Sequence, residues 1–106
     1  MVNLDPTIGA EIQKKRPVVI VSSDAVGKLP LKLVAPITSW REQFTQSFWH
    51  VRINPDKMNG LAKPSAVDTL QLRGVDVQRF VHKIGRVSAP TMEEIVAAIA
   101  AVIEYQ

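Results

Sequence analysis

The chain has 106 residues, the size of one ordinary domain, so we expect a single domain over residues 1–106 with one core. Hydrophobic residues make up 46% and charged residues 22%, a balance typical of globular proteins that excludes a disordered chain. The net charge of +3, with thirteen Lys and Arg, permits a nucleic-acid partner without requiring one.

The residue inventory excludes several kinds of chemistry. Without cysteine there are no disulfides, thiolate nucleophiles or Cys-based zinc sites. The two histidines, His50 and His82, lie far apart with no metal-ligand spacing, so we expect no metal and no other cofactor. The longest apolar run, residues 95–103, is about half of the ~20 residues that a membrane span needs, so we expect a cytoplasmic protein with no membrane partner.

Residues 5–16 read as a turn and a glycine loop that end in three consecutive cations, Lys14, Lys15 and Arg16. These cations directly precede residues 17–22, which are apolar on both faces and predict a central strand. Because a strand gains nothing from the repulsion between them, the run is either a solvated loop or a site that meets an anion.

The following segments predict a curved sheet. Residues 31–39 favour a second strand in which Pro36 indicates a bulge or an edge. Residues 46–54 alternate, so Trp49, Val51 and Ile53 should face the core, and Phe48, His50 and Arg52 the opposite side.

Two more strands and a helix complete the predicted domain. Residues 65–73 and 80–87 read as strands, the first with Thr69, Gln71 and Arg73 on a common side. After Pro90, Thr91 and Glu94 form a predicted capping box ahead of an Ala-rich helix. The pattern predicts an α+β fold, mainly β: a small barrel-like sheet with a C-terminal helix.

Three ordered blocks of the chain resemble the MazF/PemK/Kid family of toxin endoribonucleases. The first joins an Asp-Pro turn to an Arg-Pro strand entry, the second is VAPITS at residues 34–39, and the third ends in a Gln-x-Arg-x-x-Asp pattern. The matching residues of the first and third blocks are Asp5, Pro6, Gly9, Glu11, Arg16, Pro17, Gly60, Ser65, Gln71, Arg73 and Asp76.

The resemblance implies a fold, an activity and partners. The fold would be an SH3-like barrel of the PemK and CcdB type, forming a homodimer, with a first strand clipped because only residues 1–4 precede Asp5. The activity would be metal-independent cleavage of single-stranded RNA at short sequence motifs, which inhibits translation. A cognate antitoxin would neutralise this toxin of a type II toxin-antitoxin pair.

Metal-free RNA cleavage needs a group that accepts the 2′-OH proton, one that protonates the leaving 5′-oxygen, and positive charge beside the phosphorus. Arg16 suits the last role, because guanidinium is permanently charged and grips two phosphate oxygens. By resemblance, Thr38 would bond the phosphate or the attacking hydroxyl, and Glu11 would orient Arg16 or transfer a proton. One branch of the family carries a different acid-base set at positions held here by Ala10, Asp68 and Leu70, so the general acid stays unassigned.

Further residues are candidates for RNA contacts: Lys14, Lys15, Ser39, His50, Arg52, Gln71 and Arg73. Each has a plainer interpretation as well, a solvated cation for the lysines and a partly exposed sheet residue for His50. The alternative function is a non-catalytic relative of the same fold that binds RNA without cutting it or that poisons DNA gyrase.

Overall fold

A computed structural model describes residues 7–11, 16–22 and 30–103, with the backbone alone for residues 7–11 and 81. Within these residues, the strands belong to one antiparallel sheet, followed by a single long helix, and three short 3-10 segments lie between strands. The elements are β1 Thr7–Glu11, β2 Pro17–Ile20, β3 Leu31–Ser39, η2 Glu42–Gln46, β4 His50–Ile53, β5 Ser65–Asp68, η3 Thr69–Gln71, β6 Arg73–Asp76, η4 Val77–Arg79, β7 Phe80–Arg86 and α1 Ala89–Ile103.

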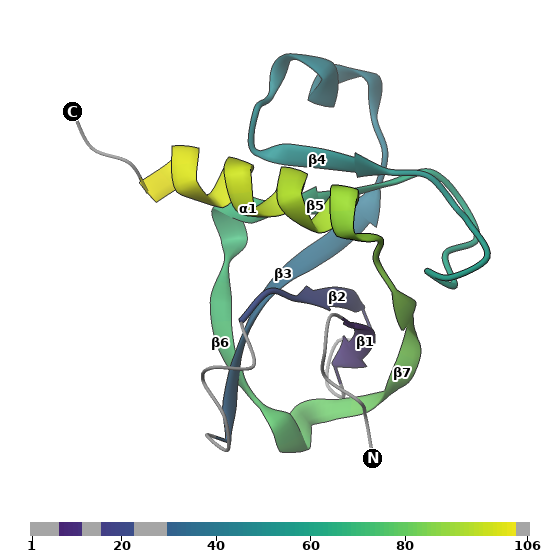
Figure 1. The fold of residues 1–106 in the computed structure, drawn as a ribbon, viewed down its shortest axis with the longest axis vertical. Helices are drawn as coiled ribbons and strands as arrows, with labels where there is room; N and C mark the ends of the chain where they lie inside the picture. The colour runs from purple at the N-terminus through teal and green to yellow at the C-terminus, as the bar shows by residue number, and fades with distance from the viewer. Residues whose placement is uncertain (1–6, 12–15, 23–29, 104–106) are drawn as a thin grey trace.

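The sheet curls strongly without closing (Figure 1). Its strand order is β4-β5-β3-β2-β1-β7, with β6 paired to β3 off this path. Within the described residues the two end strands, β4 and β7, do not pair with each other. The predicted mainly-β architecture with a C-terminal helix is therefore confirmed. Among the described residues the barrel-like sheet stays open, because β4, β6 and β7 each pair with a single strand.

Strand β1 occupies part of the segment predicted as a glycine loop. Ile8 pairs with Val19 of β2, and the other edge of β1 pairs with β7 through register shifts on both sides of Gly9. The loop prediction was wrong here because pairing on both edges outweighs the turn-forming tendency of a single glycine.

Strand β3 changes partner along one edge, and Pro36 lies at the change. Residues 31–34 pair with β6 and residues 37–39 pair with β5, while the opposite edge pairs with β2. A proline has no N–H to donate, so it fits between two ladders on that edge. Pro36 therefore marks the switch point of a central strand, not the edge position or bulge that the sequence suggested.

The core lies on both faces of β2, as its composition predicted. Val19 belongs to a cluster that includes Ile37, Val51 and Ile95 and lies between the sheet and α1. Residues Val18 and Ile20 belong to a second cluster, with Val34, Val75 and Phe80, on the opposite face of β2. Apolar side chains thus pack against both faces of the central strands, and the sheet curls around the second cluster.

The predicted strand over residues 65–73 is broken by η3. The Asp68 carboxylate accepts a hydrogen bond from the Leu70 N–H at 3.1 Å, which stabilises the turn, and Thr69 is buried with its hydroxyl donating to the Trp49 carbonyl at 2.8 Å. The alternation of Thr69, Gln71 and Arg73 was therefore wrong, because an Asp side chain that bonds the backbone two residues on favours a turn over a ladder.

Helix α1 begins earlier than the predicted capping box. Ser88 is its N-cap: its Oγ accepts from the Thr91 N–H at 3.3 Å, and its carbonyl accepts from the Met92 N–H at 2.9 Å. The helix buries Ile95 and Ala98 against the sheet. In the described part of the chain, no helix is both long and apolar enough to span a membrane.

Candidate active site

A pocket opens where β2 and β3 part. Their ladder pairs Ile20 with Val34 and Val18 with Pro36. Continued in the same register, it brings Arg16 opposite Thr38, although 22 positions separate them in the chain. Beyond the last pair the strands border a cavity of about 460 Å³, which both residues line.

The pocket is lined by groups that suit an anion. Arg16 and Lys63 are exposed, so their positive charges face solvent. Thr38, Ser39 and Ser65 add hydroxyl-bearing side chains to the lining, and none of the described lining residues is acidic. A cavity lined by two cations and several hydroxyl groups favours a negatively charged ligand such as a phosphodiester.

The pairing of β1 with β2 bears on the position of Glu11, the third predicted catalytic residue. In the β1–β2 ladder, Gly9 pairs with Val18 and Ala10 with Pro17, so the next step brings position 11 beside Arg16. Extended by one and two steps past their last pairs, the two ladders would place positions 11, 16 and 38 in one row across three neighbouring strands. The structure describes only the backbone of Glu11, and Lys14 and Lys15 lie outside the described residues.

The opposite wall of the pocket comes from residues 60–63 and from Ile84 of β7. Lys63 is the functional candidate that sequence reasoning missed. The available signal was its position between Gly60 and Ser65 of the third block, but an isolated exposed lysine carries no pattern of its own.

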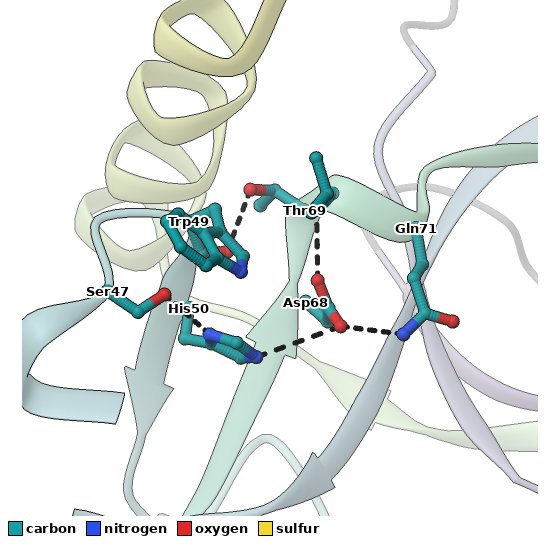
Figure 2. A network of polar contacts seen from close by, with 7 residues as sticks. Ser47, Trp49, His50, Asp68, Thr69 and Gln71 are labelled. Atoms are coloured by element: carbon teal, nitrogen blue, oxygen red, sulfur yellow. Dashed lines mark hydrogen bonds and ion pairs between the residues drawn. The ribbon is translucent and has the colours of Figure 1, made fainter. Parts of the chain in front are cut away.

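His50 lies in a separate polar network (Figure 2). A hydrogen bond of 2.6 Å joins its Nδ1 to the Ser47 Oγ, and its Nε2 lies 3.7 Å from Asp68 Oδ2. Asp68 also accepts from the Gln71 side-chain amide at 2.8 Å. Both ring nitrogens of His50 are thus engaged within the fold, as are both carboxylate oxygens of Asp68 and the side-chain nitrogen of Gln71.

Arg52 belongs to an aromatic cluster beside this network. Its guanidinium lies 4.8 Å from the centroid of the Trp40 ring, and its Nε donates to the Asn54 side-chain oxygen at 3.1 Å. Phe44 stacks on His50, with ring centroids 3.9 Å apart and planes within 6°. His50 and Arg52 line a second pocket of about 440 Å³ between β4 and α1 and do not line the first.

The structure therefore divides the described site residues that were predicted into three groups, of which His50 and Arg52 line the second pocket. Arg16, Thr38 and Ser39 share the first pocket, whereas Gln71 and Arg73 line neither pocket. Among the described residues, no group of three His, Cys, Asp or Glu side chains is arranged to hold a metal ion.

Comparison with known proteins finds relatives that are similar over most of this chain. The chain is 30% identical over 98 residues to the endoribonuclease EndoA of Bacillus subtilis, covering 92% of this chain and 83% of the relative. It is 28% identical over 104 residues to the endoribonuclease MazF9 of Mycobacterium tuberculosis, covering 92% and 86%. The solved structure of the M. tuberculosis toxin MazF-mt6 matches with a TM-score of 0.75 at 29% identity, covering 92% of this chain and 94% of that one.

The family model described as "PemK-like, MazF-like toxin of type II toxin-antitoxin system" matches residues 1–103, nearly the whole chain. This match includes the three sequence blocks, both sides of the pocket and helix α1. The chain therefore belongs to the family of PemK-like, MazF-like toxins of type II toxin-antitoxin systems.

Proposed function

We propose that this chain is an endoribonuclease toxin that cleaves single-stranded RNA in the pocket between β2 and β3 and so inhibits translation. The single observation that carries the proposal is that Arg16 and Thr38, distant in sequence, line one cavity together with the exposed cation Lys63. Two relatives named as endoribonucleases, similar over most of the chain, support it.

The chemistry follows from the groups in the pocket. The 2′-OH of the RNA attacks the adjacent phosphorus, the bond to the 5′-oxygen breaks, and the products are a 2′,3′-cyclic phosphate and a 5′-OH. Arg16 binds the non-bridging oxygens and stabilises the negative charge that develops on them. Thr38 aligns the phosphate or the attacking hydroxyl. Glu11 lies on β1, where the next step of the β1–β2 ladder would pair it with Arg16, and it orients the guanidinium or accepts a proton.

The remaining candidates form the RNA track beyond the reacting phosphate. Ser39 lines the same pocket, so it contacts the nucleotide next to the cut. Arg52 is exposed on the face opposite Val51 and Ile53, and its cation attracts the RNA backbone farther along. Gln71, Arg73, Lys14 and Lys15 complete the proposed set of RNA contacts, whereas His50, whose ring nitrogens are both engaged within the fold, is left as a structural residue of β4.

The partners follow from the family. A type II toxin is paired with an antitoxin, so a cognate antitoxin neutralises this chain by covering the pocket. We place the active protein in the cytoplasm, where mRNA is available, as a homodimer of single toxin domains that uses no metal.

The decisive experiment incubates the purified protein with a long RNA in EDTA and maps the 5′-OH ends. The expected result is a set of cuts at one short motif, with cyclic phosphate on the upstream fragments. Arg16→Ala should abolish the cuts while its circular dichroism spectrum stays that of the wild type. Intact RNA across varied sequences would reject the enzyme, and stalled DNA supercoiling by gyrase in that case would identify the non-catalytic alternative.

A further inference from the structure

The wall opposite Arg16 is built by residues 54–64, which we call the 54–64 loop. It connects β4 to β5 and supplies Gly60, Leu61, Ala62 and Lys63 to the pocket. A loop of this length is mobile unless its backbone is tied down. Its internal contacts therefore decide whether Lys63 has a defined position.

Asn59 is the centre of these contacts. Its side chain is 1% exposed, and its Oδ1 accepts from the N–H groups of Asp56 and Leu61 at 3.2 and 3.0 Å. Its Nδ2 donates to the Asn54 carbonyl at 2.9 Å. The Asp56 Oδ1 in turn accepts from the N–H groups of Met58 and Asn59 at 2.7 and 2.8 Å. One buried amide thus ties both halves of the loop together.

Two glycines then allow the loop to pack closely against β7. Gly60 has a positive φ of 69°, and a Cβ there would meet the Ile84 carbonyl oxygen at 2.3 Å. A Cβ at Gly85 would meet the Met58 carbonyl oxygen at 2.4 Å, and that oxygen accepts from the Arg86 N–H at 2.9 Å. Only glycine allows the two backbones to approach this closely, so the loop packs against β7 in a defined position.

The end of the loop that carries Lys63 is also held. The Ser65 hydroxyl donates to the Lys63 carbonyl at 2.9 Å, and the Pro64 carbonyl accepts from the Trp40 N–H at 3.0 Å. The second bond ties the loop to the residue that follows β3, the strand carrying Thr38. The backbone of Lys63 is thereby held at the pocket, while its exposed side chain remains available to a ligand.

Resting on the proposed function, we infer that Lys63 is a second phosphate-binding cation of the site, contacting an RNA phosphate next to the one that Arg16 holds. Both cations line the same cavity, Arg16 from the strand entry and Lys63 from the loop. Lysine offers a point charge without the planar fork of arginine, so it suits binding more than transition-state recognition. Lys63 therefore contributes to RNA affinity and not to the chemical step.

The test compares Lys63→Ala with Lys57→Ala, a matched control. Lys57 is an exposed lysine of the same loop that does not line the pocket, so both variants lose one charge. Lys63→Ala should raise KM about 3- to 10-fold with kcat preserved, the loss expected for one hydrogen bond to a phosphate. The Lys57→Ala control should shift KM less than 2-fold.

The salt dependence of binding gives a second, independent measurement. RNA with hydrogen in place of the 2′-OH at the cleavage site cannot react, so its Kd can be measured as a function of salt. Losing one phosphate contact to single-stranded RNA should reduce the slope of log K against log salt by about 0.7 in Lys63→Ala. Equal slopes and KM values in the two lysine variants would overturn the inference.

These measurements separate the two proposals. If wild-type protein leaves reactive RNA uncut, the proposed function fails, whereas the Kd series still reports whether Lys63 binds phosphate. If wild-type protein cuts and Lys63→Ala matches Lys57→Ala, only the role of Lys63 fails. Lys63→Glu should weaken binding more than Lys63→Ala, because it places a negative charge beside the RNA backbone.

Discussion

Two polar regions of this molecule, the network around His50 and the pocket between β2 and β3, differ in where their polar groups are directed. In the network of Ser47, His50 and Asp68, each polar side chain bonds to a neighbour within the fold. In the pocket, by contrast, the described residues provide no hydrogen-bond or ion-pair partner for the Arg16 guanidinium or the Thr38 hydroxyl. Polar groups satisfied internally stabilise the fold, whereas groups directed into a cavity remain available to bind a ligand.

The difference matters because His50, Asp68 and Ser47 carry the side-chain types of a hydrolytic triad. Their Oγ–Nδ1 and Nε2–Oδ2 contacts form a continuous chain, and Asp68 also bonds the Leu70 N–H and the Gln71 amide. These last bonds hold η3 at the end of β5. The comparison therefore predicts that variants of the network change stability, and that variants of the pocket change catalysis.

The largest expected effect is that of Arg16→Ala on the cleavage rate. Removing one group that stabilises a developing anion costs about 100- to 1,000-fold in kcat, without loss of melting temperature because Arg16 is exposed. Single-turnover cleavage of a defined RNA measures the effect. Arg16→Lys should recover part of the rate, since it keeps the charge and loses the planar fork. A rate within 3-fold of wild type in Arg16→Ala would end the catalytic assignment.

Asp68→Ala should show the opposite pattern. It leaves the Leu70 N–H and the Gln71 amide without their acceptor, so the free energy of unfolding should fall by about 1–3 kcal/mol. Because Asp68 does not line the first pocket, kcat per folded molecule should stay near the wild-type value. Urea unfolding, together with cleavage below the midpoint, measures both. A lost kcat with unchanged stability would assign the network to the chemistry instead.

Thr38→Val tests the pocket by a nearly isosteric change. Valine keeps the branched shape that suits a strand and removes only the hydroxyl, so thermal unfolding should be unchanged. If the hydroxyl bonds the reacting phosphate or the 2′-OH, kcat/KM should fall by about 10-fold. Thr38→Ser, which retains the hydroxyl, is the matched control and should lose little. Equal rates for the two variants would show that Thr38 has only a structural role.

Ser47→Ala should have the smallest effect of the series. It removes the hydrogen bond to His50 Nδ1, which contributes about 1 kcal/mol to the free energy of unfolding, and it should leave cleavage unchanged. Thermal unfolding with a parallel cleavage assay measures both quantities. Loss of cleavage in a folded Ser47→Ala protein would contradict the division between the two regions.

Much of the fold was predictable from local patterns. The apolar segment at β2, the alternation of Val51, Arg52 and Ile53 in β4, and the Ala-rich helix all have the predicted form, because burial on one face or both imposes a period that the residues display. Strand β1 and the break at η3 were missed. Both depend on particular partners, a strand on each edge for β1 and the Asp68 carboxylate for η3.

The residues of the candidate site likewise separate into those that local sequence predicted and one that it did not. Arg16 and Thr38 were identifiable because each lies in a recognisable block of sequence, and their shared pocket agrees with that reading. Lys63 was not identified, because its position between Gly60 and Ser65 does not by itself mark an exposed lysine as a ligand-binding residue. Its place in the pocket depends on Asn59 and on two glycines that seat the loop on a strand more than 20 positions away.

By itself the amino-acid sequence determined the family, the mainly-β class, the final helix and the cation at the entry of the second strand. These are properties of short segments, whose apolar period and residue order act locally. Only the tertiary structure decided that Arg16 and Thr38 line one pocket, that the described sheet stays open, and that Lys63 lines the same cavity as Arg16. Those outcomes depend on strand register and loop anchoring, which long-range hydrogen bonds and close packing establish.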